Sequence, residues 1–203
     1  MDAQAWDERY AAVDRVWSQG PNQFVAASLA GLPPRDALDL ACGEGRNALW
    51  LAGGGWRVTA IDFSQVAVER GRRLAQEAGL EIDWRTEDVL TADLPEADLV
   101  VLAYLQLPQV ERRHAVRRAW AAVRRGGTFF LVAHDTTNLT EGTGGPQDAT
   151  VLYSAADVLA DLGDPDADTV RAERVARVVA DEDDHGGTAE RVAWDVLVHL
   201  VRR

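Results

Sequence analysis

The stretch that decides the fold is residues 36 to 48, which read Asp-Ala-Leu-Asp-Leu-Ala-Cys-Gly-Glu-Gly-Arg-Asn-Ala. An apolar strand carries Asp39 near its end and breaks at Gly43-x-Gly45 into the start of a helix. Glycine lets the backbone turn tightly and approach a bound molecule, and the N-terminus of the next helix offers N–H groups to its negative parts. The stretch therefore predicts a site for a nucleotide-type cofactor.

The glycines alone leave two cofactors open. Residues 43 to 48 match the dinucleotide pattern G-x-G-x-x-G/A, and Asp62 follows at about 20 positions, where a ribose partner is expected. Asp39 and Glu44 would repel the pyrophosphate of NAD at this turn. They suit S-adenosylmethionine better, because it carries an ammonium and a sulfonium and its ribose still needs an acidic partner. We expect S-adenosylmethionine; an NAD-dependent oxidoreductase and a catalytically silent cofactor-binding protein are the alternatives.

The segment from Leu38 to Gly45 resembles the first motif of the class I S-adenosylmethionine-dependent methyltransferases. The resemblance implies that Asp62 binds the ribose hydroxyls and that Phe63 packs on the adenine. It also implies that Asp88 and the Val89 N–H meet the adenine edge. The full cofactor-binding set expected on this basis is Asp39, Ala41, Gly43, Gly45, Arg46, Asn47, Asp62, Phe63, Ser64, Asp88, Val89, Ala103, Tyr10 and Asn22.

Two N-terminal segments sharpen the resemblance. The string Gly43-Glu-Gly-Arg-Asn-Ala48, together with residues 6–10 and 21–24, is similar to a subgroup of small bacterial methyltransferases that includes the tellurite-resistance enzymes. In that subgroup the Arg-Asn pair and the Pro-Asn segment both approach the cofactor pocket. Trp6, Tyr10, Val13 and Trp17 recur at helical spacing, followed by a loop over 18–24. We expect residues 1–30 to form a lid; a helix packed on the sheet edge is the alternative.

The rest of the chain predicts an α/β fold. Strands are expected at 56–61, 82–88, 98–104 and 127–133, and helices at 65–78, with Ser64 as N-cap, and at 108–124. After a helix at 154–162, strands at 169–179 and 189–201 form a hairpin around an acidic turn at 181–187. We expect one domain over 1–203, a Rossmann-like, doubly wound, seven-stranded sheet that is mostly parallel with an antiparallel last strand. A dehydrogenase would add parallel strands instead.

Methyl transfer from a sulfonium needs positioning and exclusion of water more than it needs side-chain chemistry. A soft anionic acceptor would need no base. For a hydroxyl or amine, the candidates at the ends of the fourth and fifth strands are Tyr104, Gln106, His134 and Asp135, with His134 and Tyr104 as the catalytic prediction. Neighbours in an extended chain point to opposite sides, so Asp135 should not orient the His134 ring. A purely structural His134 is the competing interpretation.

Charge and composition limit the partners. The net charge of −12 argues against nucleic acid, and the fourth strand lacks the Asn/Asp-Pro-Pro-aromatic motif of base methyltransferases. We therefore expect a small-molecule acceptor, either an O, N or S nucleophile of a metabolite or natural product, or a chalcogen oxyanion. We expect residues 134–150 to form a substrate loop, with a plain surface loop as the alternative. The arginines between 112 and 125 are predicted to be a solvated face.

The remaining expectations concern the setting of the protein. No metal constellation stands out, and no apolar stretch is long enough to span a bilayer. No signal peptide is recognisable and a single cysteine, Cys42, rules out an internal disulfide, so we expect a cytoplasmic protein. We expect a monomer or a homodimer.

Overall fold

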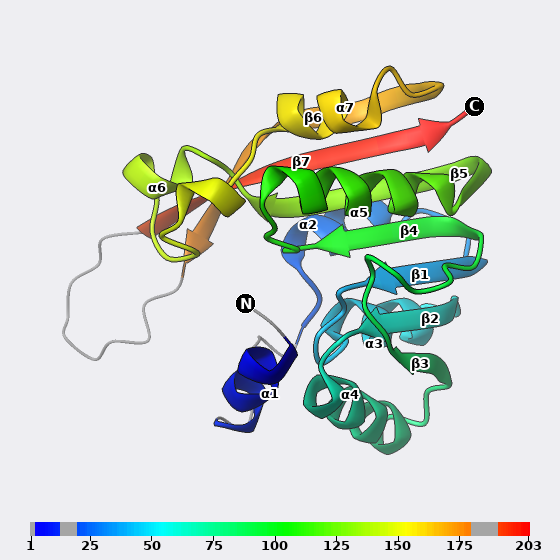
Figure 1. The fold of residues 1–203 in the computed structure, drawn as a ribbon. Helices are drawn as coiled ribbons and strands as arrows, with labels where there is room; N and C mark the ends of the chain where they lie inside the picture. The colour runs from blue at the N-terminus through cyan, green and yellow to red at the C-terminus, as the bar shows by residue number, and fades with distance from the viewer. Residues whose placement is uncertain (1–2, 13–19, 180–190) are drawn as a thin grey trace.

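The computed structural model describes residues 3–12, 20–179 and 191–203 (Figure 1). A seven-stranded sheet with the strand order β3-β2-β1-β4-β5-β7-β6 forms the centre of this part of the chain. Its strands are β1 (Asp36–Leu40), β2 (Arg57–Asp62), β3 (Ile82–Thr86), β4 (Ala97–Ala103), β5 (Val123–His134), β6 (Ala167–Val179) and β7 (Arg191–Arg202). β1 to β5 pair in parallel, and β7 runs antiparallel to both β5 and β6. The predicted fold class is therefore confirmed.

Helices cover both faces of the sheet. They are α1 (Ala3–Ala11), α2 (Gln23–Leu29), α3 (Arg46–Gly53), α4 (Gln65–Glu77), α5 (Gln109–Ala121), α6 (Asn138–Glu141) and α7 (Ala155–Leu162), with a 3₁₀ turn η1 (Ala149–Val151). Apolar residues of α5 and α7 share one core cluster with the sheet, and those of α2, α3 and α4 share the other. Two covered faces explain why β4 is almost continuously apolar.

Side-chain caps fix several helix starts. Ser64 Oγ accepts the N–H of Ala67 at the start of α4, as predicted. Asn22 does the same for α2, because its Oδ1 accepts the N–H groups of Phe24 and Val25 at 2.9 and 3.2 Å. The predicted loop over 18–24 is therefore wrong at its end, where Gln23 already begins a helix. Val13, Trp17 and the turn at 181–187 lie outside the described residues.

The boundary between α5 and β5 also differs from the prediction. The helix expected at 108–124 ends at Ala121, and the strand expected from 127 begins at Val123, which pairs with Ala97 of β4. Arg124 supplies the physical reason. Its Nη1 lies 2.7 Å from Asp36 and 2.8 Å from Asp98, so the chain is drawn to the carboxylates beside β1 and β4.

The prediction of a solvated arginine face is correct for Arg113, Arg117 and Arg125, which are exposed, and wrong for Arg112. Arg112 is only 5% exposed, and its Nε donates to buried Asp161 of α7 at 2.7 Å. Arg113 joins the same carboxylate, while Arg118 donates to the Val89 carbonyl oxygen. The acidic partner of these arginines therefore belongs to the same polypeptide. The arginines join α5 to α7 and to the loop after β3.

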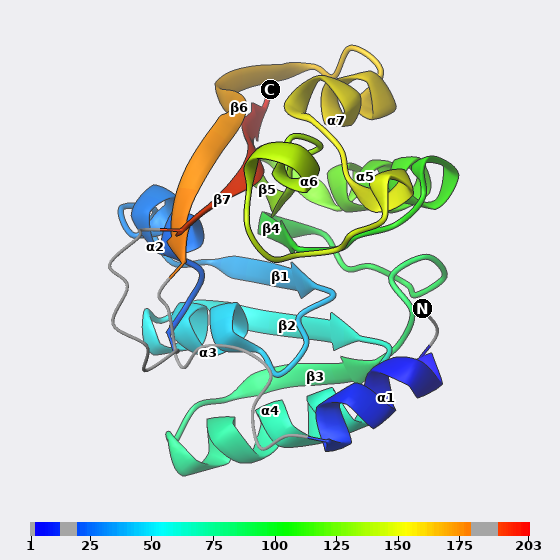
Figure 2. The same ribbon diagram turned by 90° about the vertical axis from the view of Figure 1, so that its left-hand side faces the viewer.

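One end of the sheet collects the expected site residues. β1 pairs with both β2 and β4, so the strand order reverses between β1 and β4, and ligands of open α/β sheets bind at the carboxyl ends beside such a reversal. β4 points to the end of the molecule where α1 and α6 lie (Figure 1), and Figure 2 looks onto that end. In the described part of the chain, no helix is long and apolar enough to cross a membrane.

Candidate functional site

The turn between β1 and α3 forms one wall of the site. Ala41, Gly43 and Gly45 all have positive φ, at 52°, 56° and 78°. The Cys42 N–H donates to the Ile61 carbonyl oxygen of β2, which holds the turn against the neighbouring strand. A left-handed alanine is strained, and such strain gathers at functional sites. Burial raises the pKa of the Cys42 thiol, which disfavours its thiolate form.

Gly45 is glycine for a packing reason as well as a backbone one. A Cβ added at Gly45 would lie 2.1 Å from the Trp84 ring of β3. Gly71 of α4 contacts the same ring, since its added Cβ would lie 2.4 Å away. The turn, α4 and β3 therefore meet at Trp84, and the second glycine of the motif serves this contact whether or not a ligand is bound.

Asp62 stands at the carboxyl end of β2 and is fixed by two backbone donors. Its Oδ2 accepts the Gly43 N–H at 2.8 Å and its Oδ1 accepts the Ser64 N–H at 2.9 Å. Burial raises the pKa of Asp62, and these two donors oppose that rise. Each oxygen keeps a further lone pair, so the carboxylate can still accept the two hydroxyls of a ribose.

Asp39 lies beneath the turn, fully buried, and neither carboxylate oxygen has a hydrogen-bond partner among the described residues. Burial raises its pKa to about 7, opposed in part by the nearby Ala48 backbone, which makes no hydrogen bond of ordinary geometry with the carboxylate, and by the Arg46 charge. An unpaired buried carboxylate is costly, and a nearby cation lowers that cost. With Asp62 alongside, this set fits a cationic adenosyl cofactor and opposes a pyrophosphate.

Asn22 and the Arg46-Asn47 pair come together at the end of β4. Asn47 Oδ1 accepts the Asn22 N–H at 2.9 Å, and Asn22 Nδ2 donates to the Tyr104 hydroxyl at 3.2 Å. The Arg46 guanidinium lies 5.7 Å from the centre of the Tyr104 ring. Burial lowers the pKa of Arg46. The start of α2, the start of α3 and the end of β4 thus meet at Tyr104.

α1 packs beside the same turn. Asp7 Oδ1 accepts the Ser64 hydroxyl at 2.5 Å and the Val66 N–H at 3.2 Å, so α1 contributes to the cap of α4. Arg70 of α4 binds Glu44 of the turn at 2.5 Å and donates to the carbonyl oxygen of buried Tyr10 at 2.9 Å. Arg70 therefore links α1 to the turn between β1 and α3. The helix of the predicted lid thus lies beside this turn.

The residues expected around adenine, Phe63, Asp88 and Val89, lie on the loops after β2 and β3. Asp88 is exposed and its Oδ1 accepts the Leu90 N–H, whereas Val89 is buried. Phe63 and Ala103 are partly buried. The structure leaves their predicted roles untested.

A polar cluster at the ends of β4, β5, β6 and β7 forms the second wall. Asp195 is fully buried and accepts the Tyr104 hydroxyl at 2.8 Å and the Arg177 Nε–H at 2.7 Å. Its other oxygen lies 3.2 Å from His134 Nδ1. Burial raises the pKa of Asp195, but the contacts with His134 and Arg177 outweigh it and lower the pKa below its ordinary value. Burial raises the pKa of Tyr104 well above its usual range, which keeps the phenol protonated.

Sequence reasoning found Tyr104 and His134 but missed Asp195 and Arg177. The available signal was Asp195 itself, a lone acid within the apolar run from Val192 to Leu200. A charge in a buried strand needs partners, so its position predicts a polar cluster. The other two candidates have different tasks: Gln106 accepts the His134 backbone N–H, and Asp135 accepts from Thr137. As predicted, Asp135 does not orient the His134 ring.

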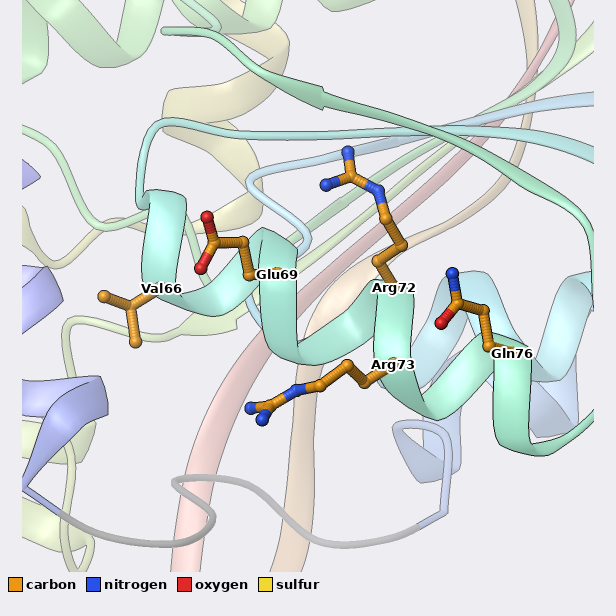
Figure 3. A pocket seen from close by; sticks show the side chains of 5 residues that line it. All are labelled: Val66, Glu69, Arg72, Arg73 and Gln76. Carbon is orange, nitrogen blue, oxygen red and sulfur yellow. The ribbon is translucent and has the colours of Figure 1, made fainter.

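A separate hollow of about 370 Å³ lies along α4 (Figure 3). Its lining side chains all come from that helix and none is a predicted site residue; they are Val66, Glu69, Arg72, Arg73 and Gln76. Within the described ranges, no group of three or more His, Cys, Asp or Glu residues could hold a metal ion.

Comparison with known proteins supports what the geometry indicates. The family described as "Methyltransferase domain" matches residues 37–127. The ubiquinone biosynthesis O-methyltransferase of Methylocella silvestris is 36% identical over 125 residues, which cover 61% of this chain and 48% of that protein. The chain therefore spans about half the length of the curated relatives that it matches.

Solved structures agree over nearly the whole chain. TehB from Haemophilus influenzae superposes with a TM-score of 0.75 at 16% identity, covering 99% of this chain and 67% of that chain. The N-methyltransferase NodS from Bradyrhizobium japonicum, in complex with S-adenosyl-L-homocysteine, gives 0.72 at 20% identity, covering 98% and 97%. The molecule therefore has the class I methyltransferase fold. The sequence match over residues 37–127 and this fold agree with the resemblance of the first motif to the class I S-adenosylmethionine-dependent methyltransferases.

Proposed function

We propose that this protein transfers a methyl group from S-adenosylmethionine directly to a small-molecule acceptor. The observation that carries the proposal is the turn after β1, where unpaired Asp39 lies beneath the backbone and Asp62 is fixed beside it by two N–H groups. When bound, the cofactor supplies an electrophilic methyl group. The protein binds and orients both reactants and excludes water, which is worth several kcal/mol of barrier.

The residues divide by task. Asp62 would hold the ribose, Asp88, Val89 and Phe63 the adenine, and Asp39 would favour the ammonium end. For a hydroxyl or amine acceptor, His134 is the better base of the two predicted catalytic residues. Tyr104 stays protonated and already donates to Asp195, so its role is to shape the acceptor side. A soft anionic acceptor would need neither His134 as a base nor Tyr104.

Calorimetric titration tests the cofactor. S-adenosylmethionine and S-adenosylhomocysteine should bind, and NAD should not. The Asp39→Ala variant should bind S-adenosylhomocysteine less tightly, because it loses the charge that favours the ammonium. Tighter binding of NAD by that variant, with no binding of the adenosyl ligands, would instead support an oxidoreductase.

The acceptor is tested by release of S-adenosylhomocysteine with a catechol, an alkyl amine, a thiol, selenite and tellurite. The names of the relatives include an O-methyltransferase and an N-methyltransferase, which supports an oxygen or nitrogen nucleophile. The net charge of −12 supports a small molecule over nucleic acid. Multiple turnovers with any acceptor would exclude the catalytically silent alternative.

A further inference from the structure

The side chain of His134 is held from two directions by residues far apart in the sequence. Its Nδ1 is buried and lies 3.2 Å from Asp195 Oδ1 of β7. Neither atom has a hydrogen bond of ordinary geometry among the described residues, so the 3.2 Å approach brings together two buried and otherwise unpartnered atoms. In a neutral imidazole this favours the proton on Nδ1, because a bare nitrogen lone pair facing the carboxylate would be repelled.

Gly145 contacts the ring from the loop that follows β5. A Cβ added at Gly145 would lie 2.9 Å from both Cε1 and Nδ1 of His134. Its φ of 76° is also one that side chains rarely adopt. The absence of a side chain at this position lets the loop press on the ring at the edge that faces Asp195.

The loop is fixed to the strand that carries Asp195. Asn138 is 1% exposed; its Nδ2 donates to the Gly144 carbonyl oxygen at 2.8 Å, and its Oδ1 accepts the Trp194 N–H at 2.7 Å. One buried amide thus holds the neighbours of Gly145 and of Asp195 in register. The Thr143 N–H adds a bond to the Val192 carbonyl oxygen at 2.9 Å.

We propose that Asp195 and Gly145 are positioning residues that hold His134 with its proton on Nδ1, which leaves Nε2 to take the proton of the methyl acceptor. The X–H bond of the acceptor breaks, its electron pair stays on X for attack on the methyl carbon, and the proton binds Nε2. Asp195 offsets the resulting charge on the ring. This inference rests on the proposed function for its chemistry, but the orientation of the ring can be measured without cofactor or acceptor.

The test is the tautomer of His134, read from two-bond ¹H–¹⁵N correlation spectra on the alkaline plateau of its titration and assigned with His134→Gln. We expect Nδ1 to be protonated and Nε2 unprotonated in the wild-type protein. Asp195→Asn removes the charge, and Gly145→Ala displaces the ring, so each should move the signals toward the mixture of a free imidazole. Gly144→Ala is the matched control, because its φ is 69° but an added Cβ meets nothing within 4 Å.

A wild-type ring protonated on Nε2, or unchanged signals in both Asp195→Asn and Gly145→Ala, would overturn the proposal. If a variant fails to fold, the wild-type pattern and the other variant still decide. Titration with S-adenosylhomocysteine separates the positioning of His134 from the proposed methyltransferase function. A protein with the expected tautomer that binds no adenosyl ligand would overturn the proposed function and leave the positioning of His134 intact.

Discussion

The two walls of the site are assembled in different ways. In the wall formed by β1 and β2, Asp62 reaches Gly43 across 19 residues of chain, and most of its members follow directly after a strand. In the wall formed by β4 to β7, Tyr104 and Asp195 are 91 residues apart, and four strands each contribute one side chain. The first wall is a local motif, whereas the second exists only once the hairpin has closed the sheet.

The largest expected effect on stability comes from a change in the wall formed by β1 and β2, called the local wall below. Gly45→Ala should lower the free energy of unfolding by about 2–5 kcal/mol, because the new Cβ collides with Trp84 and the φ of 78° is unfavourable for alanine. Trp84→Leu should relieve the collision, so the double variant should lose less than the two single variants together. Denaturant unfolding measures this. A strictly additive result would show that Trp84 is not the reason for glycine here.

The double variant also sharpens what the glycine is for. If Gly45→Ala/Trp84→Leu regains stability and binds S-adenosylhomocysteine normally, the bare backbone at Gly45 serves packing alone. If stability returns but binding does not, the missing side chain also serves the ligand.

Asp39, in the local wall, should make the free energy of unfolding depend on pH. Its pKa rises from 3.8 unfolded to about 7 folded, so the folded state binds more protons between these values and stability falls as pH rises. At 1.36 kcal/mol per pKa unit, the difference between wild type and Asp39→Asn should change by about 3 kcal/mol between pH 5 and pH 8. Urea unfolding of both proteins across that range measures it, and parallel pH curves would contradict it.

Sequence reasoning succeeded where the structure is local. The strand-to-helix turn after β1 and the Ser64 cap follow strand ends at short spacings, and the hairpin after residue 150 indicated the antiparallel strand. It failed where a partner is distant. Arg112 looked solvated because Asp161 is 49 residues away, and Asp195 gave no motif because its partners come from three other strands.

The N-terminal part was predicted less well than the motif beside it. Asn22 was expected in a loop, yet it caps α2, binds Asn47 and donates to Tyr104. No local pattern distinguishes an N-cap with a third, long-range partner from a loop asparagine. Asn22 contacts both walls, through Asn47 and through Tyr104. Changes at this residue therefore test whether the two walls are energetically independent.

Tyr104→Phe tests that junction. The change should lower stability by about 1 kcal/mol, because Asp195 loses a donor and Asn22 loses an acceptor. Tyr153→Phe is the matched control: it also removes a buried hydroxyl, which donates to the Leu105 carbonyl oxygen at 2.9 Å outside the cluster. A double-mutant cycle with Asn22→Ala should show coupling for Tyr104 and none for Tyr153. Equal coupling for both would mean that the walls are not joined through this contact.

The smallest effect is expected at α1, where the predicted lid meets the local wall. Asp7→Ala removes the acceptor of the Ser64 hydroxyl and the Val66 N–H, so the docking of α1 on α4 should weaken by about 0.5 kcal/mol, the lower end for hydrogen bonds that are only partly buried. Hydrogen exchange of the α1 amides measures the docking, and calorimetry with S-adenosylhomocysteine measures the site. Glu8→Ala is the control, because Glu8 is exposed and its side chain accepts from Gln4 of the same helix, away from α4. Faster exchange with weaker binding would make α1 a lid, whereas faster exchange with unchanged binding would make it a helix packed on the sheet edge.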